Sequence, residues 1–371
     1  MKTSRIRVTL MEVEPTVVRV IDVPAGVLLP ELHALLQVAL GWTDSHLHQF
    51  EADGICYGMP GIVEPEDERD ESAITLRAMP DRFRYLYDFG DSWEHEVLVV
   101  GPGGDRPGVV AGEGPCPPED VGGSSGYSDF RRVMADPDDP EHASLRTWAG
   151  NWHDGFDLDN ADLLVRQTVG QVPATVRLVL NLAADGVKLT PGGRLPRAIA
   201  RQVQEHYPSW QLSDRLVSIE DDLPPLAALH DLLRHVGLLR LRNGVLAPAR
   251  AAADDVEVIR RLRSWFGPSD SFDSLLVGDS LAMLAVDGAC RPEELAIRLF
   301  PLLGDRWVTS QGQPLDERLV CHALFRLQAP LVGLDLIQVD CDRWTAGASA
   351  LWLLPRATAL AHIWSDANLS S

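Results

Sequence analysis

The chain has 371 residues, of which 45% are hydrophobic, and a formal net charge of −21. More than one domain is predicted, because single hydrophobic cores stop growing at about 250–300 residues. Residues 1–168 contain 13 Lys and Arg against 31 Asp and Glu, a net of −18, so the second half is nearly neutral. Nucleic-acid affinity depends on Lys and Arg at the phosphates, and direct nucleic-acid binding is therefore not expected. A cation or a basic partner suits the first half better.

Three further classes of protein are disfavoured. The first twenty residues mix charged with alternating apolar residues, and no apolar run approaches the roughly 18 residues that span a bilayer, so a cytoplasmic protein without membrane contact is expected. Five widely spaced cysteines without a CxxC pair predict buried, reduced thiols rather than disulfides or a cysteine zinc site. Lysine occurs only at positions 2 and 188, and neither forms a phosphate-binding GxxxxGK[ST] loop.

The opening segments predict strand, strand and helix. Residues 6–13 and 16–23 are rich in alternating apolar residues and predict a strand pair, and residues 29–42 have leucines at helical spacing with Gly41 as a stop. Residues 46–58 predict a hairpin that turns at Asp53 and Gly54. The acidic run at 64–71 is typical of a solvated loop.

Residues 83–100, FRYLYDFGDSWEHEVLVV, predict a second hairpin. Gly90 stands at the first central position of the sequence FGDS, as a two-residue type II′ turn requires. In that register Asp88 faces Trp93 and Leu86 faces His95. Asp88 and His95 would then share one face of the hairpin, with their Cβ atoms about 5–8 Å apart.

The remaining segments predict an α+β chain of two domains. Residues 101–126 are too rich in Gly and Pro for regular structure, three helices are expected at 128–135, 141–149 and 158–168, and residues 170–173 form the domain boundary. A helix followed by a two-stranded hairpin is predicted twice, at 223–251 and 319–361, which is typical of winged-helix-like units. The predicted domains are 1–168, a mixed domain with antiparallel hairpins and helices, and 172–371, a mostly helical region with units at about 172–267 and 270–371.

The first half also resembles a known family. The stretches VVRVIDVPAGVLLPELHALLQVALGW, HLHQFEADG, FRYLYDFGDSWEHEV, PCPPEDVGGSSGYSDF and DPEHASLRTWAGNWHDGFDLDNADLL are similar to the plasmid pRiA ORF-three-like family, whose members are also labelled insertion-element passenger proteins of the TnpR type. The similarity covers about residues 5–168. It implies an α+β domain and an association with mobile elements, and it assigns no reaction.

Polar residues of these stretches are candidates for a ligand-binding site. Histidine and carboxylate together suit zinc, manganese or iron, and Asp88 with His95 is the predicted nucleus of a divalent metal site. The alternative is structural, with Asp88 and Asp91 bonded to the backbone of a tight turn and His95 bonded to a buried carbonyl. An acid at 119–120 or His48 would complete a site. The ligand-binding candidates are His48, Asp88, Asp91, Trp93, His95, Glu119, Asp120 and Tyr127, and His46, Glu94, His153, Asp154 and Asp157 are further polar residues of the same stretches.

Three functions remain open from the sequence. The first is a non-enzymatic binding, adaptor or regulatory protein with a protein partner or a small ligand. The second is a metal-dependent enzyme that uses Asp88, Asp91 and His95. The third is a DNA-associated transcriptional or mobile-element accessory factor, although the candidate reading helix in 223–237 has few cations.

Overall fold

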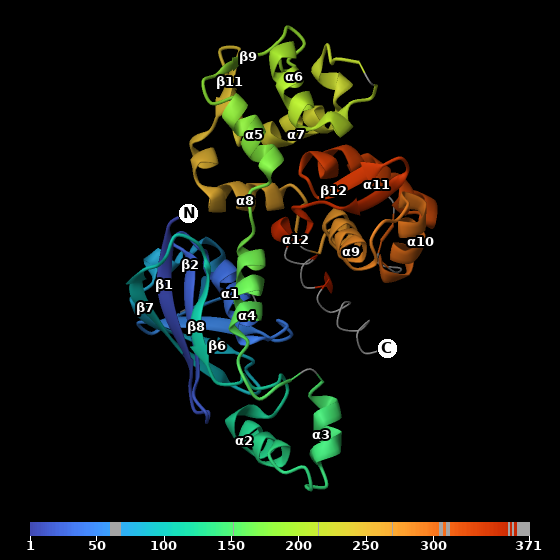
Figure 1. Ribbon diagram of the computed structural model, residues 1–371. Helices are drawn as coiled ribbons and strands as arrows, with labels where there is room; N and C mark the ends of the chain where they lie inside the picture. The colour runs from blue at the N-terminus through green and yellow to red at the C-terminus, as the bar shows by residue number, and fades with distance from the viewer. Residues whose placement is uncertain are drawn as a thin grey trace. The chain divides into compact units, whose positions relative to one another are not determined.

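The computed structural model describes residues 1–59, 68–150, 152–213, 215–268, 270–303, 307–308, 312–354, 357 and 360–361. The chain divides into two compact units, Met1–Val169 and Gly170–Ser371. The first is a mixed sheet with helices and the second is mainly helical, which confirms the predicted α+β class (Figure 1). Among the helices within these ranges, none combines the length and the apolar character needed to cross a membrane.

An eight-stranded sheet forms the centre of the first unit, in the order β5-β4-β3-β6-β7-β1-β2-β8. All neighbouring strands are antiparallel except β4 and β5, which are parallel. The strands are β1 (Thr3–Leu10), β2 (Val17–Pro24), β3 (His48–Ala52), β4 (Ile55–Gly58), β5 (Glu68–Asp70), β6 (Arg82–Tyr87), β7 (Trp93–Pro102) and β8 (Gly108–Glu113).

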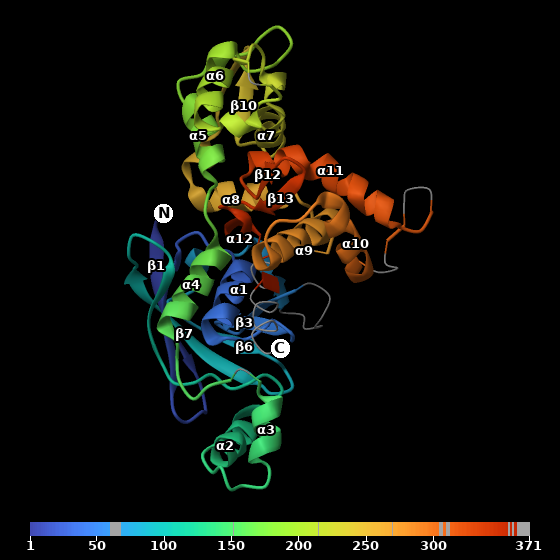
Figure 2. The ribbon, with the colours of Figure 1, turned by 45° about the vertical axis from the view of Figure 1, so that its right-hand side comes forward.

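Helices α1 (Leu29–Leu40) and α4 (Leu158–Val169) lie next to each other beside this sheet (Figure 2). Leu29, Leu32 and Leu36 of α1 are fully buried, and each buried leucine side chain stabilises the fold by about 1.5–3 kcal/mol. The helix ends where Gly41 adopts a left-handed φ of 95°, as its position in the sequence predicted. The remaining helical elements of this unit are α2 (Gly123–Met134), α3 (His142–Trp148), and the short 3-10 helices η1 (Glu71–Ala73) and η2 (Leu76–Ala78).

The predicted register of the central hairpin is wrong by one residue. Tyr87 pairs with Trp93 and Tyr85 pairs with His95, so the loop between the strands has five residues, 88–92. Because neighbouring side chains alternate between faces, this slip moves His95 to the buried face that carries Phe83, Tyr85 and Tyr87. Asp88 is a loop residue and does not share a strand face with His95.

Two other segments differ from expectation. The region 101–126 contains strand β8, which pairs with the edge of β2, and the first four residues of α2. Gly112 is needed in that strand because a Cβ there would lie 2.4 Å from the Phe156 ring. In the acidic run 64–71, residues 64–67 lie outside the described ranges, and Glu71 is buried rather than solvated.

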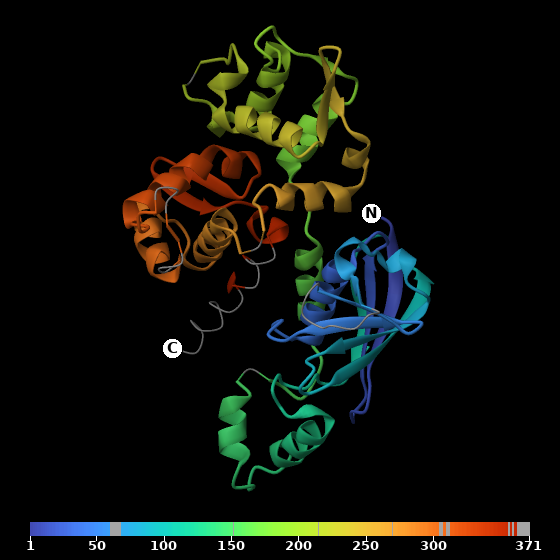
Figure 3. The same cartoon turned by 180° about the vertical axis from the view of Figure 1, so that it is seen from behind.

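The second unit repeats one order of elements. Its first part contains α5 (Ala174–Leu182), β9 (Val187–Lys188), α6 (Arg197–His206), η3 (Pro208–Trp210), η4 (Glu220–Asp222), α7 (Pro224–His235), β10 (Leu239–Arg242), β11 (Val245–Pro248), η5 (Arg250–Ala253) and α8 (Asp255–Ser264). Its second part contains α9 (Phe272–Asp287), α10 (Pro292–Leu303), α11 (Glu317–Gly333), β12 (Ile337–Asp340), β13 (Arg343–Ala346) and α12 (Ala350–Leu353). The two predicted helix–hairpin segments are thus present, and the β10–β11 hairpin is visible in Figure 3.

The third helices of the two parts, α7 and α11, pack against each other. Gly333 of α11 makes this approach close, since a Cβ there would lie 2.7 Å from the carbonyl oxygen of Pro225. The short strand β9 pairs with β11, and Cys290 forms a bridge to Trp344 of β13 in the corresponding place. Both parts therefore share the order helix, strand, helix, helix, hairpin.

Candidate metal centre

The loop 88–92 directs one oxygen of Asp88 away from the hairpin. Asp88 has a left-handed φ of 55°, and its Oδ1 accepts hydrogen bonds from the backbone amides of Gly90 at 2.9 Å and Asp91 at 3.3 Å. This is the structural role that the sequence offered for Asp88. Its Oδ2 lies 3.6 Å from Nε2 of His46. The side chain of Asp88 therefore both closes the loop and faces a histidine.

A second loop, 43–47, brings His46 to this place. The backbone amide of Asp88 donates to the carbonyl of Leu47 at 2.9 Å, and the amide of Ser45 donates to the hydroxyl of Tyr87 at 3.0 Å. The imidazole of His46 packs edge-on against the Tyr87 ring, with centroids 5.9 Å apart. His46 is thus positioned by the strand end that precedes Asp88.

The third contribution comes from the segment 117–122. Glu119 accepts hydrogen bonds from the hydroxyls of Thr43 and Tyr87, and the amide of Gly122 donates to Oδ2 of Asp91 at 3.0 Å. Between these two anchors, Asp120 has a left-handed φ of 59° and places Oδ1 3.1 Å from Nε2 of His46.

These three side chains form a cluster suited to a divalent cation. One donor atom each from His46, Asp88 and Asp120 lies within 4.8 Å of the others. Two ligands about 2.1 Å from one ion and about 90–110° apart are separated by about 3.0–3.4 Å, close to the distances of 3.1 and 3.6 Å from His46 Nε2 to the two carboxylates. One imidazole nitrogen and two carboxylate oxygens are a donor set for zinc, manganese or iron.

The environment of His46 Nε2 supports this interpretation. The atom is buried and, although both carboxylates are at ion-pair distance, it makes no hydrogen bond with any described residue. Carboxylate oxygens of Asp88 and Asp120 thus lie near a ring nitrogen that has no hydrogen-bond partner among the described residues. A metal ion bound by the three groups would satisfy that nitrogen.

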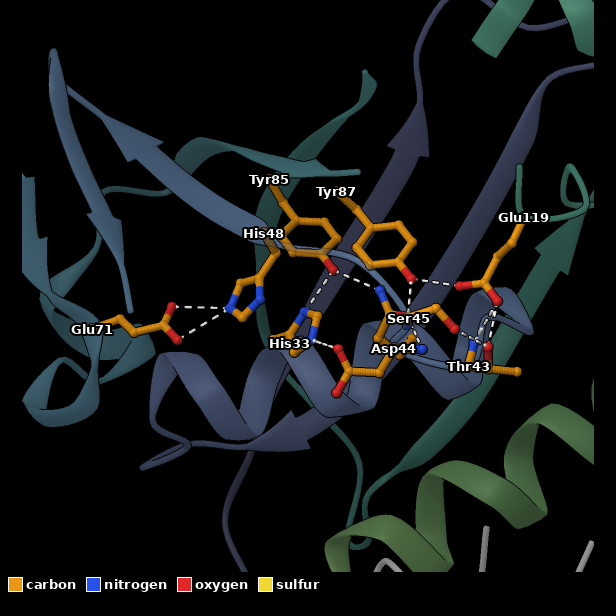
Figure 4. A network of polar contacts seen from close by, with 10 residues as sticks. His33, Thr43, Asp44, Ser45, His48, Glu71, Tyr85, Tyr87 and Glu119 are labelled. Carbon is orange, nitrogen blue, oxygen red and sulfur yellow. Dashed lines mark hydrogen bonds and ion pairs between the residues drawn. The ribbon is translucent and has the colours of Figure 1, made fainter. Parts of the chain in front are cut away.

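A network of polar contacts reaches the loop that carries His46, through Asp44 and Ser45 (Figure 4). The rings of His33 and His48 stack with centroids 3.5 Å apart, and Nε2 of His48 lies 3.1 Å from the buried carboxylate of Glu71. His33 bonds to Asp44 at 2.7 Å through Nε2 and to the hydroxyl of Tyr85 at 2.7 Å through Nδ1. The network joins helix α1, strands β3 and β6, and the loop that carries His46.

Burial sets the protonation of several groups in this network. It raises the pKa of Tyr85 well above its ordinary range, and burial together with the bonded Glu119 raises the pKa of Tyr87. Both hydroxyls remain neutral donors at physiological pH. Burial lowers the pKa of His33, which its bond to Asp44 opposes.

The other sequence candidates have internal partners or buried positions. His48 bonds to Glu71, Glu119 to Tyr87, and Tyr127 donates to the carbonyl of Pro115 at 2.7 Å. Trp93 is buried beside Trp42, with ring centroids 6.2 Å apart. None of the five cysteines forms a disulfide bond, as expected, although Cys290 alone among them is buried and Cys341 is exposed.

His95 lies in the strand interior and is not among the three clustered donors. Its Nδ1 is 3.1 Å from the carbonyl oxygen of Tyr85, and its ring packs against Trp42 and Tyr85. Burial lowers the pKa of His95 to about 4, an effect that the Tyr85 carbonyl partly opposes. The ring is therefore neutral at physiological pH.

Sequence reasoning selected Asp88 and Asp120 but passed over His46 as a ligand. The signal that finds it is the pairing of β3 with β6, in which His48 lies opposite Tyr87. His46 precedes His48 by two residues, so this pairing places it beside the loop that starts at Asp88. Glu71 was missed for a different reason, since its neighbours are acidic and the run looked solvated.

Comparisons with known proteins agree with the sequence resemblance. Residues 2–164 match the family described as plasmid pRiA4b ORF-3-like protein. The uncharacterized protein y4hQ of Sinorhizobium fredii (strain NBRC 101917 / NGR234) is 40% identical over 156 residues, which are 40% of this chain and 80% of that protein. The uncharacterized protein y4jL of the same strain is 36% identical over 76 residues, or 19% of this chain and 34% of that protein.

A solved structure also matches this region. The crystal structure of a protein of unknown function, MM3350 from Methanosarcina mazei Go1, is 26% identical with a TM-score of 0.38, and the match covers 43% of this chain and 97% of that chain. The family match and the 40% identity to y4hQ confirm the resemblance found in the sequence. The chain belongs to the plasmid pRiA4b ORF-3-like family.

Proposed function

We propose that the chain is a non-enzymatic binding protein whose first unit binds a divalent metal ion through His46, Asp88 and Asp120. One observation carries this proposal: donors from three separate loops converge within 4.8 Å around a buried imidazole nitrogen that makes no hydrogen bond. The net charge of −18 over residues 1–168 favours a cation at this place.

A metal ion would have a clear structural effect on these loops. The segments 43–47, 88–92 and 117–122 are joined by hydrogen bonds, among them Asp88 to Leu47, Gly122 to Asp91 and Thr43 to Glu119. An ion bound to the native state only would stabilise that state, by about 2.7 kcal/mol at a concentration of 100 times Kd. Metal binding would thereby order the surface formed by the most distinctive stretches of the sequence.

The test is metal analysis and calorimetric titration with zinc and manganese on the untagged full chain. His46→Ala, Asp88→Asn and Asp120→Asn are each expected to weaken binding at least tenfold. Asp88→Asn retains the oxygen that accepts from Gly90, so its loop is expected to survive. Asp53→Asn is a matched control for Asp120→Asn, because both residues are exposed aspartates with a left-handed φ. Absence of binding in the wild type, or equal binding in all variants, would refute the proposal.

A metal-dependent enzyme is the second candidate, favoured by the number of ligands. Three protein ligands leave coordination positions open for water or substrate, the arrangement typical of catalytic zinc. Hydrolysis of p-nitrophenyl acetate and p-nitrophenyl phosphate by zinc- or manganese-loaded protein, compared with His46→Ala, tests this candidate. Asp91 and His95 are less suited to such a site, since Asp91 bonds to Gly122 and His95 lies in the sheet interior.

For the second unit, we propose two winged-helix-like parts that make protein contacts. The repeated order of elements supports the winged-helix interpretation. In such units the third helix usually enters the DNA groove, but α7 and α11 pack against each other, which reduces the surface that either helix could present to a groove. A DNA titration at about 150 mM salt is expected to show weak binding or none, and nanomolar binding of a specific site would favour the accessory-factor alternative.

A further inference from the structure

A cavity of about 490 Å³ lies in the first unit and has no role in the metal proposal. Its walls are the end of helix α1, the segment 116–119 and parts of residues 148–164. This volume is within the range of about 300–1,000 Å³ that is typical of small-ligand sites. Aromatic rings and carboxylates both line it, and these side chains indicate which kind of ligand the cavity can bind.

The apolar walls are held rigidly by hydrogen bonds from two indoles. Nε1 of Trp42 donates to the carbonyl of Pro117 at 2.9 Å, and Nε1 of Trp152 donates to the carbonyl of Cys116 at 2.8 Å. Both indole N–H groups are thereby used within the fold. Their rings are left to make contacts through their faces and edges.

Trp148 is the most accessible ring of the cavity. It belongs to helix α3 and is 48% exposed, although it makes a T-shaped contact with the ring of Phe130, with centroids 6.0 Å apart. Exposed tryptophan is unusual unless it makes a contact, because its ring carries a large apolar area. A flat cation can stack on such a ring, and arginine does so most often.

The charge of the cavity favours a cation. The carboxylates of Glu119 and Asp157 line it, as do Val38, Ala39 and Leu40 at the end of helix α1. The carbonyl end of a helix carries a partial negative charge. His153 also lines the cavity, and it is exposed to solvent.

Arg19, a cation in the cavity wall, makes four hydrogen bonds to backbone oxygens. It donates from Nε to Ala39 at 2.9 Å and from the two terminal nitrogens to Val18, Glu113 and Gly114 at 2.8–3.2 Å. Its guanidinium also lies over the ring of Phe156, 3.8 Å from the centroid. Arg19 thus shows that a guanidinium can be held in this wall by stacking on an aromatic ring and by hydrogen bonds to oxygen atoms. The guanidinium of a ligand would need contacts of the same two kinds.

We propose that this cavity binds the guanidinium of an arginine side chain presented by a basic peptide. The guanidinium stacks on Trp148 and donates hydrogen bonds to the carboxylate of Asp157, whose Oδ1 already accepts from the amide of Asn160 at 3.0 Å. Planar shape and paired donors distinguish arginine from lysine at such a site. The metal ligands His46, Asp88 and Asp120 do not line this cavity, so the inference does not depend on the metal proposal.

The test is calorimetric titration of the full chain, in the presence of EDTA, with the peptide acetyl-Ser-Gly-Arg-Gly-Ser-amide. Two twin peptides carry citrulline, which is isosteric and neutral, or lysine at the same position. We expect the citrulline peptide to bind at least tenfold more weakly and the lysine peptide to bind more weakly than the arginine peptide. Trp148→Ala and Asp157→Asn should each weaken arginine-peptide binding about three- to tenfold.

Two controls separate this result from folding defects and from the metal proposal. Phe325→Ala removes a ring that is also 48% exposed, in the second unit, and should bind the peptide like the wild type. His46→Ala should also bind it like the wild type, whatever the outcome of the metal titrations. The proposal is overturned if the arginine peptide does not bind at millimolar concentration, if either twin peptide binds equally well, or if folded Trp148→Ala binds unchanged.

Discussion

The two units use buried polar residues in different ways. In the second unit, His230 and Glu220 form a fully buried pair 2.8 Å apart within a core of leucine and valine. In the first unit, buried polar groups continue from Glu71 through His48 and His33 towards the loop that carries His46. The His230–Glu220 pair thus lies inside a packed core, whereas the polar groups of the first unit also position a surface of loops.

The largest test of this comparison is removal of the whole second unit. A fragment of residues 1–169 keeps the eight-stranded sheet, both covering helices and its own core, so we expect it to be soluble and to unfold cooperatively. Its affinity for zinc should equal that of the full chain. Circular dichroism with urea unfolding and calorimetry check this, and an aggregated fragment would show that the second unit completes the core of the first.

Loss of the buried pair should produce the next largest effect. Glu220→Ala removes the partner of His230 and the oxygen that accepts from the amide of Leu195 at 2.6 Å. Because two buried groups lose their partner, the free energy of unfolding of the second unit should fall by about 3–5 kcal/mol. Metal binding should not change.

The matched control for that variant is Asp231→Asn on the following helix. Asp231 is exposed and pairs with Arg194 at 3.2 Å, a contact worth about 0–1 kcal/mol. Equal destabilisation by both variants, measured by urea unfolding, would show that burial of the His230 pair has no special cost.

His95 predicts a pH dependence of about 3 kcal/mol in the first unit. Its pKa is about 4 in the native state and about 6.5 when unfolded, so the unfolded state binds more protons between these values. Its contribution to stability is complete above about pH 6.5 and is lost as the pH falls towards 4. The buried His33, whose pKa is also lowered, contributes in the same direction.

Urea unfolding of the 1–169 fragment between pH 7.5 and about 4, with EDTA present, measures this slope. His95→Gln should be less stable at neutral pH and should show a shallower dependence. The control is the fragment variant His142→Gln, because His142 belongs to α3, a helix that has no buried residues. This variant should keep the full dependence of the free energy of unfolding on pH. An unchanged slope in His95→Gln would contradict the assignment.

Tyr87→Phe should have the smallest effect on stability and a selective effect on the loops. The variant removes the hydroxyl that accepts from Ser45 and donates to Glu119, which costs about 1–2 kcal/mol. Zinc affinity should fall, but by less than in Asp88→Asn, because no ligand is lost. Tyr207→Phe in the second unit is the control. Equal zinc affinities of the two variants would show that the Tyr87 hydroxyl does not position the metal-binding loops.

Much of the fold could be predicted because local signals agreed. Alternating apolar residues marked β1 and β2, helical leucine spacing and Gly41 marked α1, and Asn243-Gly244 marked the turn between β10 and β11. The central hairpin could not be predicted in register, since Asp88 and Ser92 adopt left-handed backbone conformations that residue type alone does not require. A shift of the pairing by one residue places the side chains of β7 on the opposite faces of the sheet from those predicted.

The candidate site was predicted in part for a related reason. Its acids stand in distinctive loop sequences, whereas its histidine depends on a contact between segments far apart in the chain. Asp88 and Asp120 could therefore be selected from the sequence, but choosing His46 over His95 required the pairing of β3 with β6.

X-ray absorption spectroscopy of the zinc-loaded full chain tests the central claim most directly. The account predicts a first shell of nitrogen and oxygen at about 2.0–2.1 Å with the scattering pattern of a single imidazole, and loss of bound zinc in His46→Ala and Asp88→Asn. A sulfur shell near about 2.3 Å, two or more imidazoles, or an unchanged spectrum in those variants would contradict it and place the zinc elsewhere.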